Sequence, residues 1–161
     1  MDGSYLGLLG FAAATFVTAL SGAIFKPGQW YEGLRKPSWR PPNWLFGPAW
    51  TVLYVTIAIA GWLVWREAGF AGAGLPFAIY GIQLVLNAVW SGLFFGLRRP
   101  DLAFVEVVLL WLSILATILA FAPIHAGAAW LLLPYLCWVA FAAWLNLTLW
   151  RMNPETVGRP A

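Results

Sequence analysis

The sequence predicts an all-α integral membrane protein built as a bundle of five transmembrane helices. Of its 161 residues, 62% are hydrophobic and only 9% are charged, whereas a water-soluble domain carries roughly 25% charged residues. A chain this apolar cannot cover its surface with polar groups, so its surroundings must be lipid. Backbone polar groups in lipid are satisfied only in helices and closed barrels, and long, uniformly apolar runs favour helices. Five runs are close to the ~20 residues that cross a hydrocarbon core: 6–25, 44–65, 75–97, 102–121 and 128–150.

The first two runs are separated by the longest connection, residues 26–43, which we call loop one. Ahead of the first run the only charged side chain is Asp2. A signal peptide begins with a basic region, so we expect this run to be a retained span. Loop one contains several prolines, which stiffen a chain, and three aromatic residues that can become buried. We therefore expect an ordered lid over one end of the bundle.

The third run carries uncharged polar side chains every four residues, at Gln83, Asn87 and Ser91. This spacing places them on one helical stripe, and polar groups inside a membrane face other helices or an internal cavity. One interpretation is structural, with hydrogen bonds between helices. The other is a cavity wall that offers amides to a ligand. The pattern alone favours the structural interpretation.

A stripe of small residues runs beside the polar one, at Ala88, Gly92 and Gly96. Small residues four apart let two helix backbones approach closely. If the polar stripe faces inward, the small stripe faces elsewhere, because neighbouring helical positions are about 100° apart. We therefore expect a homodimer in which the third spans of the two copies cross near Gly92.

The fourth run holds one carboxylate, Glu106. It lies about one turn into the run, so we expect it to reach the membrane interface and to pair with Arg98, Arg99 or Arg151. A proton relay would need a second buried acid or a histidine, and the five runs contain neither.

The fifth run has Trp138, Ala142 and Leu145 at helical spacing, with Asn146 beside them. The chain contains 12 tryptophans, more than the interfacial belts of a membrane protein need. Tryptophans within spans either pack as ordinary core or form the walls of an apolar pocket, and the pattern does not distinguish the two. The chain has one cysteine and one histidine, so the sequence predicts no intramolecular disulfide and no metal site.

Lysine and arginine are unevenly divided between the connections. If every run spans the membrane, the N-terminus, 66–74 and 122–127 lie on one side, and this side carries only Arg66. The opposite side carries eight basic residues: Lys26, Arg35, Lys36, Arg40, Arg98, Arg99, Arg151 and Arg159. Short cytoplasmic loops hold the excess of positive residues. We therefore expect the N-terminus outside and the C-terminus in the cytoplasm, in a bacterial inner membrane rather than a mitochondrial outer membrane.

Four groups of residues form a recognisable signature along the chain. The first lies in loop one and the second early in the second run; the others lie in the third and fifth runs. They are Trp30-Tyr31-x-x-Leu34-x-Lys36-Pro37-Ser38-Trp39-x-Pro41-Pro42, Phe46-Gly47-Pro48-x-Trp50-Thr51-x-Leu53-Tyr54, Gln83-Leu84-x-Leu86-Asn87-x-x-Trp90-Ser91-x-x-Phe94-Phe95 and Pro134-Tyr135-Leu136-x-Trp138-x-x-Phe141-Ala142-x-x-Leu145-Asn146. In this order and over nearly the whole chain, they resemble the TspO/MBR family, which comprises the tryptophan-rich sensory proteins of bacteria and the mitochondrial translocator protein, once called the peripheral benzodiazepine receptor.

The resemblance implies a five-helix bundle, a homodimer, and a cytosol-facing cavity covered by loop one. It also implies binding of porphyrins such as protoporphyrin IX, of sterols in eukaryotic members, and of benzodiazepine-type drugs. The family's sterol-recognition motif at the end of the fifth span requires a tyrosine before a basic residue. The corresponding run here, 145–151, has no tyrosine, which counts against high-affinity sterol binding.

Carried over position by position, the resemblance places the ligand against side chains from three spans. They are Trp50, Asn87, Trp90, Trp138 and Ala142. We add four neighbours to this candidate set: Trp39, Tyr54, Gln83 and Asn146. Some bacterial members of the family are described as degrading protoporphyrin in light, with tryptophans that match Trp50 and Trp138, and these two would be the catalytic residues of such an enzyme.

A porphyrin is a flat apolar disc with carboxylates on one edge, which suits indole walls below a basic rim. Arg35, Lys36 or Arg40 in loop one can pair with those carboxylates, although the positive-inside rule alone also explains them. The function we expect is a membrane sensor or carrier that binds tetrapyrroles as ligands, with no resident cofactor and no nucleic-acid partner. The alternative is an enzyme that catalyses light-dependent degradation of protoporphyrin IX.

Overall fold

A computed structural model describes residues 3–157 of the chain. Five of its helices are long and apolar enough to cross a membrane, and no strand occurs within the described residues. The predicted all-α membrane fold is therefore confirmed. The long helices are α1 (Gly3–Ile24), α3 (Asn43–Gly72), α4 (Gly74–Ser91) with its π-helical extension η1 (Gly92–Gly96), α5 (Pro100–Phe121) and α6 (Ala126–Met152). The short helices are α2 (Gln29–Gly33) and the 3-10 helix η2 (Pro154–Thr156).

The five long helices form a closed ring. Helix α1 packs against α3 and α4, α3 packs against α6, and α5 lies between α4 and α6. The core inside this ring contains completely or almost completely buried side chains from α3, α5 and α6, among them Ile57, Ile114 and Tyr135. Each helix thus buries its inner stripe on two neighbours and leaves its outer face apolar for lipid.

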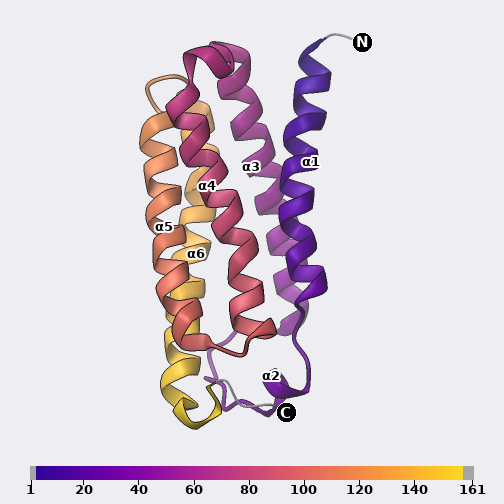
Figure 1. The fold of residues 1–161 in the computed structure, drawn as a ribbon, viewed down its shortest axis with the longest axis vertical. Coiled ribbons are helices and arrows are strands. Elements are labelled where there is room, and N and C mark those ends of the chain that lie inside the picture. Colours follow the sequence, from indigo (N-terminus) through magenta and orange to yellow (C-terminus); the bar gives the residue numbers. More distant parts are fainter. Residues whose placement is uncertain (1–2, 158–161) are drawn as a thin grey trace.

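The connections alternate between the two ends of the bundle, as the sequence predicts. The start of α1, the α3–α4 connection and the α5–α6 connection lie at one end in Figure 1. Loop one, the turn between η1 and α5, and η2 lie at the other end, which we call the loop-one end. Arg159, which the charge count includes, lies outside the described residues.

Helix α3 continues past the predicted limit of the second span at residue 65. Arg66 and Glu67 are exposed and were expected to begin a connection, but the helix includes them and ends at Gly72. The Arg66 guanidinium lies 4.8 Å from the centre of the Trp62 ring, which stabilises this solvent-side turn. The helical path breaks at Gly69, whose φ of 64° and ψ of 177° are accessible essentially only to glycine.

The third span was expected to be α-helical through residue 97, whereas its last turn widens into the π-helix η1. The Leu97 N–H donates to the Gly92 carbonyl at 2.8 Å, and the Arg99 N–H donates to the Leu93 carbonyl at 3.0 Å. The second bond closes around Arg98, whose left-handed φ of 54° ends the helix with an αL residue. The chain therefore reverses within three residues and enters α5 at Pro100.

The predicted pairing of Glu106 with an arginine is wrong. Arg99 instead pairs with Asp101 at 2.6 Å, where the carboxylate also lies at the positive end of α5. Glu106 is 6% exposed, and neither of its carboxyl oxygens has a hydrogen-bond partner among residues 3–157. The helical phase of α5 points this side chain into the bundle, so its short distance to the interface in sequence does not bring it there.

Loop one packs against the loop-one end of the bundle as an ordered cover. Its short helix α2 supplies Tyr31, and the next residues supply Leu34, each 6% exposed. Both belong to a small apolar cluster with Phe94, Ala103 and residues of the last turns of α6. The Tyr31 ring meets those of Phe94 and Phe95 edge-on at 6.3 and 5.5 Å. Burying these side chains fixes loop one over η1, the start of α5 and the end of α6.

Candidate ligand site below loop one

A hydrogen-bond network at the centre of the bundle joins α3, α4 and α6. The Tyr54 hydroxyl donates to Asn87 Oδ1 at 2.7 Å, and Asn87 Nδ2 donates to the Tyr135 hydroxyl at 2.7 Å. The Tyr135 hydroxyl in turn donates to Gln83 Oε1 at 3.0 Å. Because Tyr135 is completely buried, these bonds satisfy polar groups that have no access to water.

Two members of the predicted polar stripe therefore act in helix–helix hydrogen bonding. Gln83 and Asn87 are 1% and 5% exposed, and both bond to Tyr135. Gln83 Nε2 remains buried without a partner among the described residues, so one donor of the stripe is still open. Ser91, the third member, lies toward α1, where its hydroxyl is 4.0 Å from the position of a Cβ at Gly22.

Trp50 extends this network toward loop one. Its ring stacks on Tyr54 with centroids 5.5 Å apart and meets Tyr135 edge-on at 6.2 Å. Trp50, Tyr54 and Asn87 thus form one continuous surface of two aromatic rings and an amide.

Trp90 and Asn146 form a second pair, where η1, α5 and α6 meet. The Trp90 indole N–H donates to Asn146 Oδ1 at 3.1 Å, and Asn146 Nδ2 donates to the Pro100 carbonyl at 2.7 Å. The Trp90 ring also stacks on Phe94 at 5.1 Å. Both side chains are engaged in packing, so they give the site a fixed boundary.

Trp138 lies in an aromatic box with an unsatisfied donor. Its ring is 5.8 Å from Phe46 and 5.8 Å from Phe141, whereas its indole N–H is buried and has no hydrogen-bond partner in the described part of the chain. From loop one, Trp39 meets Phe141 edge-on at 6.0 Å. Ala142 lies half-buried one turn after Trp138 on α6, and its side chain is a single methyl group. Most buried side-chain donors have a partner. The indole N–H groups of Trp30 and Trp111 are also without one in the described residues, and an acceptor atom of a ligand would satisfy that of Trp138.

The three basic residues of the rim already have local partners. Arg35 pairs with Glu155 at 3.0 Å, and the Arg40 guanidinium donates to Asn43 Oδ1 at 2.8 Å. Lys36 Nζ donates to the carbonyls of Glu32 and Leu34 at 2.8 and 3.0 Å. Desolvation, reinforced by the charge of Arg40, lowers the pKa of Lys36. Lys36 is thus directed into loop one itself, whereas the exposed Arg35 and the half-buried Arg40 can turn toward a ligand carboxylate.

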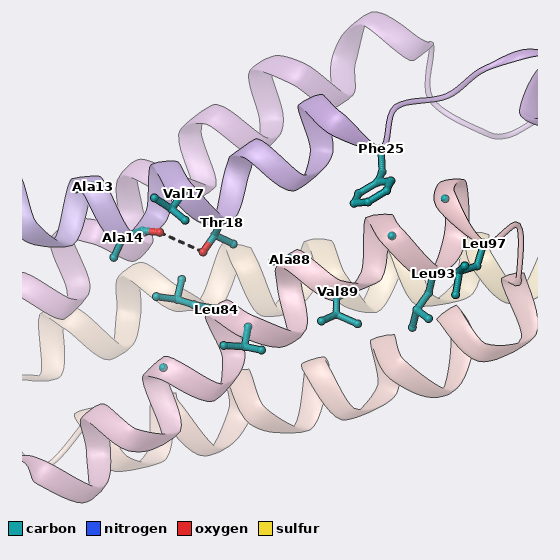
Figure 2. A pocket seen from close by; sticks show the side chains of 14 residues that line it. Ala13, Ala14, Val17, Thr18, Phe25, Leu84, Ala88, Val89, Leu93 and Leu97 are labelled. Carbon is teal, nitrogen blue, oxygen red and sulfur yellow. Dashed lines mark hydrogen bonds between the residues drawn. The ribbon is translucent and has the colours of Figure 1, made fainter.

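The predicted dimer stripe lies in a different place, on the outer surface between α1 and α4. A groove of about 1010 Å³ there is lined almost entirely by apolar residues, and Figure 2 shows Val17 and Thr18 of α1 facing Leu84 and Ala88 of α4 across it. Ala88, Gly92 and Gly96 all line it. None of the nine candidate ligand residues does.

Phe25 covers the far end of this groove. Its ring lies 2.9 Å from where a Cβ at Gly96 would be and 3.6 Å from where one at Gly92 would be, and it projects over the last turns of α4 and η1 in Figure 2. Gly96 therefore accommodates an aromatic ring of its own chain, and the open part of the small stripe is at Ala88.

Two residues that organise this end of the molecule were not predicted as site residues. Tyr135 holds the central network, and its position beside Pro134 in the middle of a span was the available signal, since a buried hydroxyl needs partners. Asn153 follows the last span and is 2% exposed; no periodicity marks it. The described residues contain no group of three histidine, cysteine, aspartate or glutamate side chains that could hold a metal ion.

Comparison with known proteins bears on this arrangement. Residues 8–151 match the model of the TspO/MBR family. The chain is 42% identical to the tryptophan-rich protein TspO of Chlorobaculum tepidum, over 91% of this chain and 89% of the relative. It is 40% identical to the tryptophan-rich sensory protein of Cereibacter sphaeroides, over 90% of both chains. It is also 40% identical to the human translocator protein, over 90% of this chain and 89% of the relative.

Proposed function

Because this chain belongs to the TspO/MBR family and is an integral membrane protein with five membrane-crossing helices, we propose that it is a receptor or carrier for flat, apolar, anionic ligands of the tetrapyrrole class. The ligand binds below loop one, between the Trp50–Tyr54 stack of α3 and the Trp138 box of α6. The observation that supports this proposal best is the buried, unpartnered indole N–H of Trp138 among aromatic rings.

The chemistry of the surrounding residues fits such a ligand. A tetrapyrrole presents two large apolar faces, which aromatic rings bind by offset stacking and edge contacts. Its propionate carboxylates need cationic partners, and Arg35 and Arg40 lie on loop one, which covers this end of the bundle. Guanidinium groups suit carboxylates because they can bind both oxygens at once. Loop one is already packed in place, which lowers the ordering required on binding.

A titration of tryptophan fluorescence with protoporphyrin IX in detergent tests the proposal. We expect saturable quenching by the purified protein. Trp138→Ala should weaken binding by about 1–3 kcal/mol, because it removes stacking area and the indole donor together. The matched control is Trp130→Ala, since Trp130 lies on the same helix but is 71% exposed at the opposite end. Unchanged affinity in Trp138→Ala, or equal losses in both variants, would exclude this location.

The same samples separate binding from turnover. A receptor or carrier returns protoporphyrin IX unchanged after illumination. A new pigment in the mass spectrum that requires both Trp50 and Trp138 would instead support the enzymatic alternative.

We further propose that the N-terminus lies outside and the loop-one end in the cytoplasm. Seven described basic residues lie at the loop-one end, and Arg66 alone lies at the other end, which is the asymmetry of cytoplasmic loops. A cysteine introduced at Gly74 should react with a membrane-impermeant maleimide from outside, whereas one at Ser38 should not. The opposite pattern would reverse the orientation.

A further inference from the structure

Asn153 joins loop one to the end of α6 through its side-chain amide. Its Oδ1 accepts a hydrogen bond from the Arg35 backbone N–H at 2.8 Å, and its Nδ2 donates to the Arg35 carbonyl at 2.8 Å. The same Nδ2 also donates to the Leu149 carbonyl at 2.9 Å. One amide therefore satisfies both backbone polar groups of a residue 118 positions away and a free carbonyl of the last turn of α6.

The Asn153 side chain is buried, whereas the ion pair beside it is exposed. Asn153 is 2% exposed, so breaking its bonds without admitting water leaves several polar groups unpaired. The nearby pair between Arg35 and Glu155 has side chains that are 66% and 50% exposed, and exposed ion pairs contribute little. Leu34, next to the bonded residue, is buried against the apolar cluster of the loop-one end. Residues 34 and 35 are therefore the point at which loop one is fixed to the end of α6.

We propose that Asn153 is the positioning residue that holds loop one closed, and that the lifetime of its bonds to Arg35 sets how fast a ligand enters and leaves. This inference rests on the proposed function, because it assigns a gate to that site. Asparagine is the side chain suited to this role. An aspartate keeps the acceptor but loses both donors and places a carboxylate against two carbonyls, whereas a serine cannot span the contacts.

Limited trypsin digestion measures directly, without any ligand, how often loop one opens. Trypsin cleaves poorly before proline, and Lys26, Lys36 and Arg40 each precede a proline. The peptide bond after Arg35 is therefore the single good trypsin site in loop one. Arg35 is also the residue whose backbone Asn153 binds. Cleavage there yields fragments 1–35 and 36–161.

We expect Asn153→Asp and Asn153→Ser to raise the rate of cleavage after Arg35 about tenfold, since local opening no longer breaks buried hydrogen bonds. The matched control is Thr156→Ala, which removes the hydrogen bond of a neighbouring side chain to the Asn153 carbonyl and leaves the amide intact. Its cleavage rate should stay within about twofold of the parent rate. Cleavage after Arg66, at the opposite end of the bundle, should not change in any variant.

Stopped-flow quenching by protoporphyrin IX then tests the gate. Association and dissociation should both accelerate in the Asn153 variants, so that Kd changes less than either rate. Unchanged cleavage after Arg35, or equal acceleration after Arg66, would overturn the positioning role, because the second outcome reports global unfolding. Faster cleavage with unchanged ligand rates would overturn the gate alone. Faster cleavage with no quenching in any variant, the parent included, would leave the positioning role standing and refute the proposed function.

Discussion

At the scale of single residues, the interior contains buried polar groups that have hydrogen-bond partners and others that have none. The hydroxyls and amides at the centre are paired through Tyr135, and they hold α4 and α6 together. Among the buried groups without a partner in the described residues, Trp138 Nε1 and Gln83 Nε2 come from the same two helices, whereas Trp30 Nε1, Trp111 Nε1 and the Glu106 carboxyl lie elsewhere. Because an orphaned buried donor destabilises the free protein, we regard these two atoms as the contacts that a ligand completes.

Removing the Tyr135 hydroxyl tests how much the central network contributes. Tyr135→Phe leaves Asn87 Nδ2 and Gln83 Oε1 without their partner, so we expect a loss of about 0.6–2 kcal/mol, the range for side-chain hydrogen bonds between membrane helices. Thermal unfolding in detergent measures it. Tyr5→Phe, at a position that is 62% exposed, should have no effect. A Tyr135→Phe protein as stable as the parent would show that the network orients side chains without stabilising the bundle.

At the scale of elements, the helix boundaries are set by local chemistry that hydropathy does not detect. The charged pair Arg66 and Glu67 predicts a helix end, yet α3 continues because these side chains extend outward from an exposed turn. The backbone then breaks at Gly69. Likewise η1 differs from an α-helix only in its hydrogen-bond register, which no apolar pattern encodes.

A substitution at Gly69 should show that this break depends on glycine. Gly69→Ala forces a side chain into a backbone region that only glycine adopts readily, so we expect a destabilisation of about 1–3 kcal/mol even though no atom lies within 4 Å of the new Cβ. Gly74→Ala is the control, because its Cβ also meets nothing within 4 Å and its φ is not positive. Equal melting temperatures for the two variants would contradict the strain argument.

The sequence was most informative about elements and least informative about side-chain direction. Length and apolar composition predict five spans, and the alternation of connections follows directly. The inward direction of Glu106 was missed because a residue one turn into α5 can point either to the interface or to the core. The choice depends on the rotation of the helix about its axis, which a uniformly apolar run does not reveal. Asn153 was missed because its partners are the backbone of Arg35, far away in sequence. Tertiary hydrogen bonds to backbone have no sequence period.

At the scale of the whole molecule, the ring has two surfaces with different uses. The aromatic and amide groups lie inside it and below loop one, whereas the groove between α1 and α4 opens on the outer surface (Figure 2). Close-approach residues gain little against lipid unless a helix packs on them. We propose that a second copy of the chain occupies this groove in a two-fold dimer. Because Phe25 covers Gly92 and Gly96, the closest approach is expected nearer Ala14 and Ala88 than Gly92.

The matched pair Ala14→Phe and Ala12→Phe tests the dimer. Both alanines are exposed on α1, but only Ala14 lines the groove, since positions two apart on a helix face different directions. A phenyl ring at Ala14 fills the space that the partner needs, so Ala14→Phe should weaken dimerisation by at least about tenfold, as overpacking of a close interface does. Ala12→Phe should behave like the parent.

Sedimentation in detergent measures the association, and the porphyrin titration should be unchanged in both variants, because no candidate ligand residue lies on α1. An Ala14→Phe protein that remains dimeric would move the interface away from this groove, and parallel loss of porphyrin binding would show that the two surfaces are coupled.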